Sequence, residues 1–267
     1  MITANGDCGS AKAQKGAIMI TLTTWNMKGG TGKTTTTFNV ATNYAKQGKR
    51  VLLLDLDIQA NLTSYFDLDL AHRAGNGKPD IAELINNNLS IRKGIYHSRF
   101  KNLHFIKGSN NQIVPYDISQ ISKMLSTIKD DYDICMIDCH PDNSLATQNA
   151  IAASNLVIIP ILLDGFSRDN LNLVVREIIN IENITGYEID FRIIVNRLRN
   201  LRSQGIIYSD LAQNHDYPIL NTSISEYSGI QSALLYHKPV YMHRSKSGAC
   251  KDYIDLATEI LENVRRM

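Results

Sequence analysis

A glycine-rich octet at residues 28–35 constrains this chain more than any other stretch. It reads KGGTGKTT, and it follows the apolar, β-rich run of residues 18–25. Directly after it comes a helical pattern in which Phe38, Ala41 and Ala45 share one face. A glycine-rich turn between a strand and a helix lets backbone N–H groups approach an anion, and the positive end of the helix dipole faces the same point. The octet therefore predicts a phosphate-binding loop.

The side chains of the octet add specific chemistry to this loop. Lys33 can reach the β- and γ-phosphates of a nucleotide as a point charge, and the Thr34 hydroxyl can bind Mg²⁺. The alternative is a glycine-rich turn with a chance Lys-Thr pair, which the strand before and the helix after disfavour. The predicted nucleotide-binding residues of the loop are Lys28, Gly29, Gly30, Thr31, Gly32, Lys33, Thr34 and Thr35.

The octet resembles the deviant Walker A loop of the ParA/MinD family of ATPases, which reads Lys-Gly-Gly-x-Gly-Lys-Thr-Thr. In that family the first lysine contacts the nucleotide of the partner subunit in an ATP-sandwich dimer, and Lys28 occupies that position. The resemblance implies ATP and Mg²⁺ as cofactors, a homodimer on ATP binding, and catalytic roles for Lys28 and Lys33. The alternative for Lys28 is a solvated surface lysine, which is a common fate for this residue type.

Two acids follow the next buried strand, which the run of residues 50–54 predicts. Ligands of open α/β sheets bind at the carboxyl ends of the strands, so Asp55 and Asp57 are expected beside the phosphate loop. The stretch resembles the family's Asp-x-Asp-Pro-Gln, whose second acid positions the attacking water, with Ile58 in place of the proline. Asp57 is therefore a third catalytic candidate and a possible metal ligand. The alternative is a strand end capped by solvated acids.

A further strand, residues 132–138, ends in Asp138 in the manner of a Walker B motif. A carboxylate at this place orients the Mg²⁺ shell, usually through a metal-bound water. The residues after it resemble the family's Asp-x-Pro-Pro turn, which follows the γ-phosphate in relatives. His140 departs from that pattern.

Asn196 ends another predicted strand, residues 193–195. In related nucleotide binders an Asn at this place contacts the adenine edge through its amide, which both donates and accepts hydrogen bonds. An Asn in an ordinary strand-end turn is an equally good reading.

Two stretches without acids carry clustered basic residues, although the net charge of the chain is only +2. Local clusters in a near-neutral protein suggest a local anionic partner, and solvated surface is the alternative. Residues 224–240 resemble the family's Ile-Pro-Arg-x-x-Arg…Lys-Pro-Val stretch, but Glu226 and Gly229 stand where relatives often have DNA-contacting arginines. The candidate DNA contacts are Arg197, Arg199, Arg202, Lys238, Arg244 and Lys246.

The ends of the chain suggest no membrane segment. Residues 1–18 lack the apolar core of a signal peptide and are expected to be a disordered leader or a scar of cloning, which leaves residues 19–267 as a single ATPase domain. No apolar run reaches about 18 residues. The last helix, near residues 252–264, has an acidic polar face, whereas a membrane-surface anchor needs a basic one. We therefore expect a cytoplasmic protein without stable membrane association.

The four cysteines are few and widely spread along the sequence. Cys135 and Cys139 lie in or beside the Walker B strand, and no pair has metal-site spacing, so they are expected to be reduced and buried. This spacing disfavours a redox ATPase of the nitrogenase iron-protein type, in which cysteines share a cluster between subunits.

The order of these elements predicts an α/β fold, with a doubly wound, mostly parallel sheet covered by helices on both faces. The resemblance covers residue 19 to the end, and it is strongest at residues 25–64 and 133–160. It points to partition proteins of the ParA/Soj type. It implies a slow ATPase that a ParB-type centromere-binding partner stimulates, and whose ATP dimer binds DNA non-specifically on the nucleoid during plasmid or chromosome segregation. A MinD-like membrane-associated positioning ATPase is the main alternative.

Overall fold

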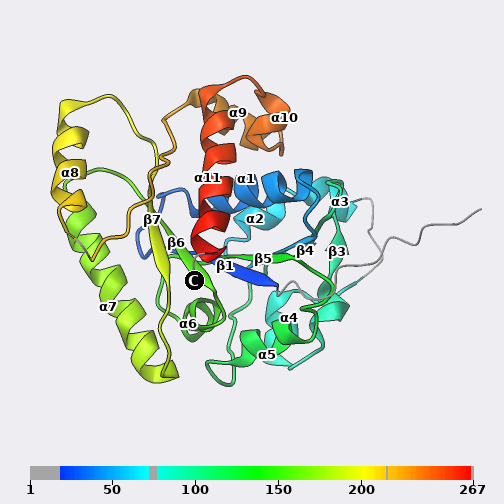
Figure 1. Ribbon diagram of the computed structural model, residues 1–267. Coiled ribbons are helices and arrows are strands. Elements are labelled where there is room, and N and C mark those ends of the chain that lie inside the picture. The colour runs from blue at the N-terminus through cyan, green and yellow to red at the C-terminus, as the bar shows by residue number, and fades with distance from the viewer. Residues whose placement is uncertain (1–18, 72–76, 215, 266–267) are drawn as a thin grey trace, which may run out of the picture.

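The computed structural model describes residues 19–71, 77–214 and 216–265. A seven-stranded sheet crosses this part of the chain in the order β3-β4-β2-β5-β1-β6-β7 (Figure 1). Every pairing is parallel except that of β3 with β4 at one edge. The strands are β1 (Ile20–Thr24), β2 (Val51–Asp55), β3 (Tyr96–His97), β4 (Leu103–Ile106), β5 (Ile134–Asp138), β6 (Leu156–Ile161) and β7 (Phe191–Val195).

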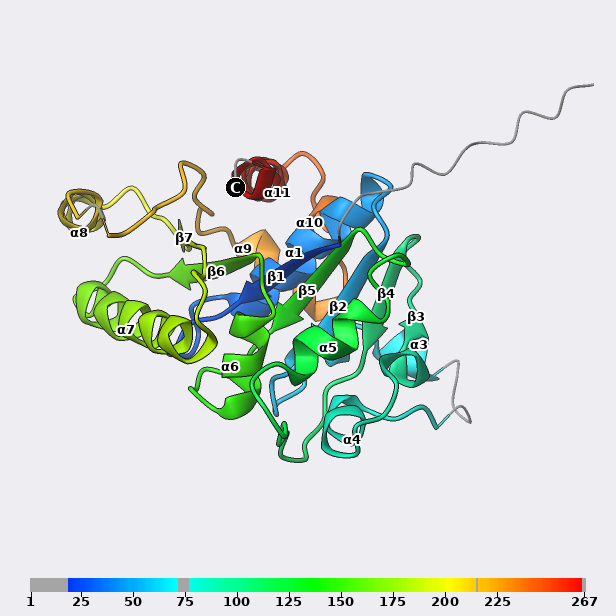
Figure 2. The ribbon, with the colours of Figure 1, turned by 60° about the horizontal axis from the view of Figure 1, so that its bottom comes forward.

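Helices cover both faces of the sheet, as Figures 1 and 2 show from two directions. On one face lie α1 and α11, with α9 and α10 beside them; on the other lie α4, α5, α6 and α7. The helices are α1 (Lys33–Lys46), α2 (Asn61–Ser64), α3 (Asp67–Ala71), α4 (Ile81–Asn86), α5 (Gln120–Ser126), α6 (Leu145–Ala152), α7 (Ser167–Thr185), α8 (Arg202–Ala212), α9 (Ser228–Leu235), α10 (Val240–His243) and α11 (Gly248–Arg265). The predicted fold class is confirmed.

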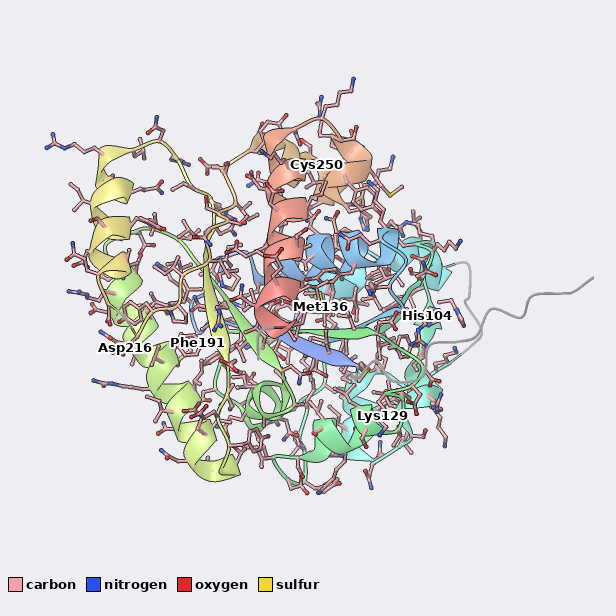
Figure 3. All side chains as sticks on the ribbon, viewed as in Figure 1. His104, Lys129, Met136, Phe191, Asp216 and Cys250 are labelled. Atoms are coloured by element: carbon pink, nitrogen blue, oxygen red, sulfur yellow. The ribbon has the colours of Figure 1, made fainter. Side chains whose placement is uncertain are left out.

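The strands are apolar on both sides because each side faces a core. In β2, Val51 and Leu53 pack toward α1 and α11, while Leu52 and Leu54 pack toward α4 and α5. This alternation explains why the strand reads as a continuous apolar run. Met136 of β5 and Cys250 of α11, labelled in Figure 3, are both buried in the core on the α1 side of the sheet, with Cys250 at the end of α11 that lies near α10.

The last helix packs into the core as its apolar stripe predicts. Tyr253, Leu256 and Ala257 are buried on the side that faces α1, and the Tyr44 hydroxyl of α1 donates to the Ala257 carbonyl at 2.8 Å. The acidic side is used within the chain, because Glu259 accepts the backbone N–H groups of residues 221 and 222. The polar face of α11 therefore ties down the segment after β7.

The structure differs from the sequence-based expectation in one region and one boundary. Within residues 67–102 the sequence predicts only a short helix from Ile81 to Ile85, which is confirmed as α4; the segment also contains α3, a 3₁₀ helix (Ile91–Gly94) and the edge strand β3. The helical spacing of Ile118, Ile121, Leu125 and Ile128 predicts a helix from Ile118, but α5 begins later, at Gln120. The reason is that Asp117 accepts the N–H and hydroxyl of Ser119 and forms a turn there. The expectation for residues 1–18 lies outside the described residues.

The topology places one edge of the sheet in position for ligand binding. The chain moves from β1 outward to β2 on one side and later, through β6, to the other side. The carboxyl ends of neighbouring parallel strands diverge at such a switch point and leave room for a ligand. The loop between β1 and α1 lies at this point.

Candidate functional site

The octet forms a tight turn at the start of α1. Gly30 and Gly32 have φ values of 73° and 96°, in the left-handed region that favours glycine. At Gly32 a Cβ atom would also lie 2.0 Å from Nδ2 of Asn196. Since α1 begins at Lys33, its first N–H groups have no partner within the helix and face the turn. The backbone thus has the form of an anion site with a helix N-terminus behind it.

Two buried asparagines hold this turn in place. Nδ2 of Asn26 donates to the Pro160 carbonyl at 2.8 Å, and its Oδ1 accepts from the Lys28 N–H and from Asn170 Nδ2, both at 2.9 Å. On the other side, Nδ2 of Asn196 donates to the Thr31 carbonyl at 2.7 Å. The loop is therefore braced from both sides before any ligand arrives. No local signal in the sequence marks Asn26, because its partners are far away along the chain.

Lys33 lies over its own loop, where its Nζ donates to the Lys28 carbonyl at 3.2 Å. Its side chain is buried, and burial lowers the pKa of the ammonium while the charges of Asp138 and Asp57 oppose that shift. The ammonium group of Lys33 lies near the carboxylates of Asp138 and Asp57 at the N-terminus of α1, where it can bind a phosphate.

Asp138 has the features of a carboxylate that can serve a cation site. It is fully buried, and burial raises its pKa well above the usual range; Asp55 adds to the shift, and the Thr34 hydroxyl and Lys33 oppose it. Its Oδ1 accepts from the Thr37 hydroxyl at 3.3 Å, but its Oδ2 has no hydrogen-bond partner among the described residues. A buried carboxylate oxygen without a partner, beside a threonine hydroxyl, fits a hydrated Mg²⁺ ion.

The described residues contain no group of three or more His, Cys, Asp or Glu side chains that could hold a metal. Mg²⁺ usually keeps several waters and takes phosphate oxygens alongside one or two protein ligands. The Thr34 hydroxyl and Asp138 suit that kind of site, in which the nucleotide completes the coordination.

The two acids after β2 have different environments. Asp55 has a structural role, because its Oδ2 accepts both the N–H and the hydroxyl of Thr63, at 2.8 and 2.7 Å. Its burial raises the pKa to about 6. Asp57 instead faces the cavity beside the octet, where its Oδ1 accepts the Gln59 N–H at 2.8 Å. Only Asp57 is placed to act on a ligand.

Two adjoining cavities extend from the octet. The first, called here the phosphate-loop cavity, has a volume of about 400 Å³ and is lined by Asp57, Tyr65, His140 and all residues of the octet except Lys28 and Thr31. The second, called here the α9 cavity, has a volume of about 350 Å³ and is lined by Tyr227, Tyr253 and neighbouring residues of α9. Gly32, Thr35 and Arg197 line both. A charged compartment thus joins one with aromatic and aliphatic walls, which suits a phosphate chain attached to a flat ring.

Asn196 lies beside the octet and lines one of these cavities. Its amide Nδ2 is used by Thr31, and its Oδ1 accepts the N–H of Arg197 at 2.9 Å. It lines the α9 cavity and is buried. The side chain that the sequence proposes as a base contact therefore also acts as a brace of the phosphate loop.

Lys28 points away from the phosphate-loop cavity of its own chain. Its Nζ lies 2.5 Å from Asp164 Oδ2 and 5.9 Å from the centre of the Phe166 ring, both in the segment after β6. Burial acts to raise the pKa of Asp164, but the hydrogen bonds from Lys28, the Phe166 N–H and Ser167, together with the charge of Lys28, outweigh it and the pKa is lowered. The two lysines of the octet thus face different surroundings.

The basic candidates are not gathered into one patch. Arg197 lies at the mouth of both cavities, and Arg199 is paired with Glu226 through Nη2 and Oε1 at 2.7 Å. Arg202 begins α8 and is exposed. The second cluster is exposed around α10 and the start of α11; it comprises Lys238, Arg244 and Lys246. Glu226 thus offsets the charge of Arg199 within the cluster at residues 197–202, and the role of both clusters as DNA contacts stays a prediction.

Tyr65 is a site residue that sequence patterns do not indicate. It lines the phosphate-loop cavity, and its ring centre lies 4.6 Å from that of Phe38 in α1, with the two rings tilted by 37°. Burial raises the pKa of its hydroxyl to about 12, with Asp138 adding to the shift. It reaches the cavity only because α2 folds back over α1.

The chain is similar in sequence and in fold to known proteins. A family model described as an AAA domain, AAA_31, matches residues 19–191. The sporulation initiation inhibitor protein Soj of Bacillus subtilis is 26% identical over 248 residues, which is 89% of this chain and 96% of that protein. Two solved structures have the same fold.

The first structure is a putative plasmid partition protein from Borrelia burgdorferi B31 bound to AMPPNP. It has a TM-score of 0.76 at 23% identity, and the match covers 93% of this chain and all of that one (100%). The second is cobyrinic acid a,c-diamide synthase from Mycobacterium smegmatis with ADP and magnesium. It has a TM-score of 0.75 at 20% identity, and the match covers 93% of this chain and 96% of that one. Since one fold carries both proteins, the function must be argued from the site.

Proposed function

Because this chain belongs to the AAA_31 family and is a P-loop ATPase of the ParA/MinD type, close to the ParA and Soj partition proteins, we propose that it drives plasmid or chromosome partition. The observation that carries the proposal is the placement of the two octet lysines. Lys33 serves the cavity of its own chain, while Lys28 lies outside that cavity on an adjoining surface. We further propose that residues 19–267 work as one ATPase domain.

Nucleotide binding follows from the geometry of the two cavities. The loop N–H groups and Lys33 hold the phosphates of ATP, and the α9 cavity takes the base and ribose. The Thr34 hydroxyl would bind Mg²⁺ directly and Asp138 through a water, and the metal neutralises charge on the phosphates when it is bound. Asp57 faces the same cavity and orients the attacking water.

Dimerisation is the proposed consequence of ATP binding. Two ATP molecules that approach each other in a partly dried interface repel strongly, and a cation from the opposite chain offsets that repulsion. Lys28 is the side chain placed to do this once it leaves Asp164. Hydrolysis removes the γ-phosphate, so the nucleotide state that stabilises the dimer is lost and the two chains separate.

The finer assignment rests on the same surfaces. We propose that the ATP dimer binds DNA without sequence preference through Lys238, Arg244 and Lys246, with Arg202 as an outlying contact. A ParB-type centromere-binding protein would accelerate a slow hydrolysis and release the dimer. The protein would then cycle between the cytoplasm and the nucleoid.

Two observations favour this assignment over a MinD-like membrane-associated ATPase and over a redox ATPase of the nitrogenase iron-protein type. The acidic residues of α11 are engaged with residues 221–225, so this helix does not present the basic face of a membrane-surface anchor. Cys135 and Cys139 are both fully buried, which is unsuited to a cluster shared between subunits. No helix in the described part of the chain has the length and apolar character needed to cross a bilayer.

The test combines hydrolysis and sedimentation. Wild type should hydrolyse ATP only with Mg²⁺ and should sediment with plasmid DNA in the presence of a non-hydrolysable ATP analogue. Lys33→Ala should bind ATP more than tenfold less tightly, a loss of about 1.4 kcal/mol or more, and should not hydrolyse it. Sedimentation with anionic liposomes and not with DNA would favour the membrane alternative. Wild-type ATP affinity in Lys33→Ala would refute the site.

A further inference from the structure

His140 is placed where the proposed reaction takes place, although its position carries no assigned role. It follows β5 and lines the phosphate-loop cavity together with Asp57. Its Nε2 lies 3.9 Å from Asp57 Oδ1, and its Nδ1 lies 3.4 Å from Asp142 Oδ2. The imidazole thus lies between two carboxylates, with 26% of its side chain exposed, and its Nδ1 makes no hydrogen bond within the described residues.

Several hydrogen bonds hold Asp142, one of these two carboxylates, in place. Its Oδ1 accepts from the Thr147 hydroxyl at 2.7 Å and from the Ser144 hydroxyl at 3.0 Å, at the start of α6. Its carbonyl accepts from the indole of the buried Trp25 at 2.9 Å, and its N–H donates to the His140 carbonyl at 2.9 Å. These bonds leave Oδ2 as the oxygen that faces His140, on a frame that cannot easily move.

The separation between His140 and Asp57 suits an intervening water. A distance of 3.9 Å is too long for a direct hydrogen bond, and it falls in the range where a bridging water has to be considered. Asp57 is itself held by the Gln59 N–H, so its carboxylate has a defined direction. Both groups border the cavity that takes the phosphates.

The ring nitrogen that faces the cavity decides what His140 can do here. If Nδ1–H faces Asp142, Nε2 carries a lone pair and acts as an acceptor toward the cavity. A water molecule has two protons to donate. A carboxylate and an imidazole nitrogen on one side can accept one each, which directs the lone pairs of that water to the opposite side.

We propose that His140 is a second group, with Asp57, that orients the attacking water; this rests on the proposed ATPase function. The water oxygen bonds to the γ-phosphorus as the bond from that phosphorus to the bridging oxygen breaks. ADP leaves with the electron pair of the broken bond. Both water protons end on the released phosphate, which gives ADP and dihydrogen phosphate, and His140 is unchanged at the end.

The test separates turnover from binding. His140→Ala should lower kcat by about tenfold or more, while affinity for a non-hydrolysable ATP analogue stays within about twofold. His140→Gln, which restores an acceptor oxygen, should recover part of the rate. In an Asp57→Ala background, His140→Ala should add less than about twofold, because the two groups hold one water. His97→Ala, on the exposed edge strand β3, is the matched control and should behave as wild type.

The outcomes are distinguishable. An unchanged kcat in His140→Ala, with normal hydrolysis by wild type, overturns the role of His140 alone. A loss that appears only in analogue affinity overturns it too and makes His140 a phosphate contact. A loss that adds in full to that of Asp57→Ala contradicts a shared water. Wild type that neither binds nor hydrolyses Mg·ATP overturns both this role and the proposed function.

Discussion

Asp55 and Asp57 show how the surroundings of a single residue determine its role. The first accepts two hydrogen bonds from Thr63 and lies in the interior, while the second faces the phosphate-loop cavity. They are two residues apart on the same strand end. Removing the Asp55 carboxylate should therefore have a different consequence from removing that of Asp57.

Asp57→Ala should retain ATP and dimerise but fail to turn over. A positioned general-base-like group contributes on the order of 10²-fold or more to a rate, so the loss in kcat should be at least of that size. Filter binding with an ATP analogue and a phosphate-release assay measure the two properties separately. An ordinary rate in this variant would move the role to another group at the cavity.

Asp55→Asn should change the pH dependence of stability. Burial raises the folded-state pKa of Asp55 from 3.8 to about 6, so between these values the native state binds more protons than the unfolded state. Stability then falls as pH rises through this window, by roughly 3 kcal/mol for a shift of about two units.

The asparagine has no charge to bury, so its free energy of unfolding should decline less between about pH 4 and pH 6. Urea unfolding of both proteins at pH 4, 5 and 6 checks this, and the comparison cancels the other carboxyl groups. Parallel curves would show that Asp55 is not the group that titrates.

Elements determine which basic residues are available to a polyanion. The segment from α9 to the start of α11 exposes its cations, whereas after β7 Arg197 lines the two cavities and Arg199 is paired with Glu226. Phosphate contacts act through charge and counterion release, so free cations matter more than paired ones.

Replacing Lys238, Arg244 and Lys246 by Ala should weaken binding to any DNA sequence. The slope of log affinity against log salt should fall by roughly one for each lost phosphate contact. The matching triple change of Arg197, Arg199 and Arg202 should lower DNA affinity less, and it should alter ATP affinity through Arg197. Fluorescence anisotropy with two unrelated duplexes at several salt concentrations measures both effects. Unchanged slopes in both variants would remove these clusters as DNA contacts.

At the level of assembly, Lys28 is the residue proposed to connect one chain to the next. Within one chain it is paired with Asp164, on the opposite side of the octet from Lys33. The pair is partly exposed, so its contribution to stability is small and Lys28 can be released at little cost. Such a residue is suited to a switch between the monomer and an ATP dimer.

Lys28→Gln should bind ATP nearly normally as a monomer. It should fail to form the ATP dimer and should lose both hydrolysis and DNA binding, because the charge of the opposing nucleotide is no longer offset. Light scattering with a non-hydrolysable ATP analogue tests this directly, with the exposed Lys93→Gln as control. If Lys28→Gln still dimerises like wild type, the sandwich mechanism does not hold for this protein.

The sequence alone predicted the central strands, the helix after the octet, the last helix and the glycine-rich loop. These features depend on local patterns: continuous apolar runs for strands buried on both faces, apolar residues at helical spacing, and glycines in a turn before a helix. Between residues 67 and 102 the sequence predicted the short helix α4, whereas α3, the 3₁₀ helix and β3 escaped prediction because they are too brief to show a period.

Only the tertiary structure decided how residues far apart in sequence share the site. It placed Asn26 against Pro160, Asn196 against Thr31, and Lys28 against Asp164, each pair more than 130 positions apart. It also separated Asp55 from Asp57 and put His140 between two carboxylates. Hydrogen bonds and charge pairs depend on distance in space, and the sheet order that creates those distances is set by packing across the whole chain.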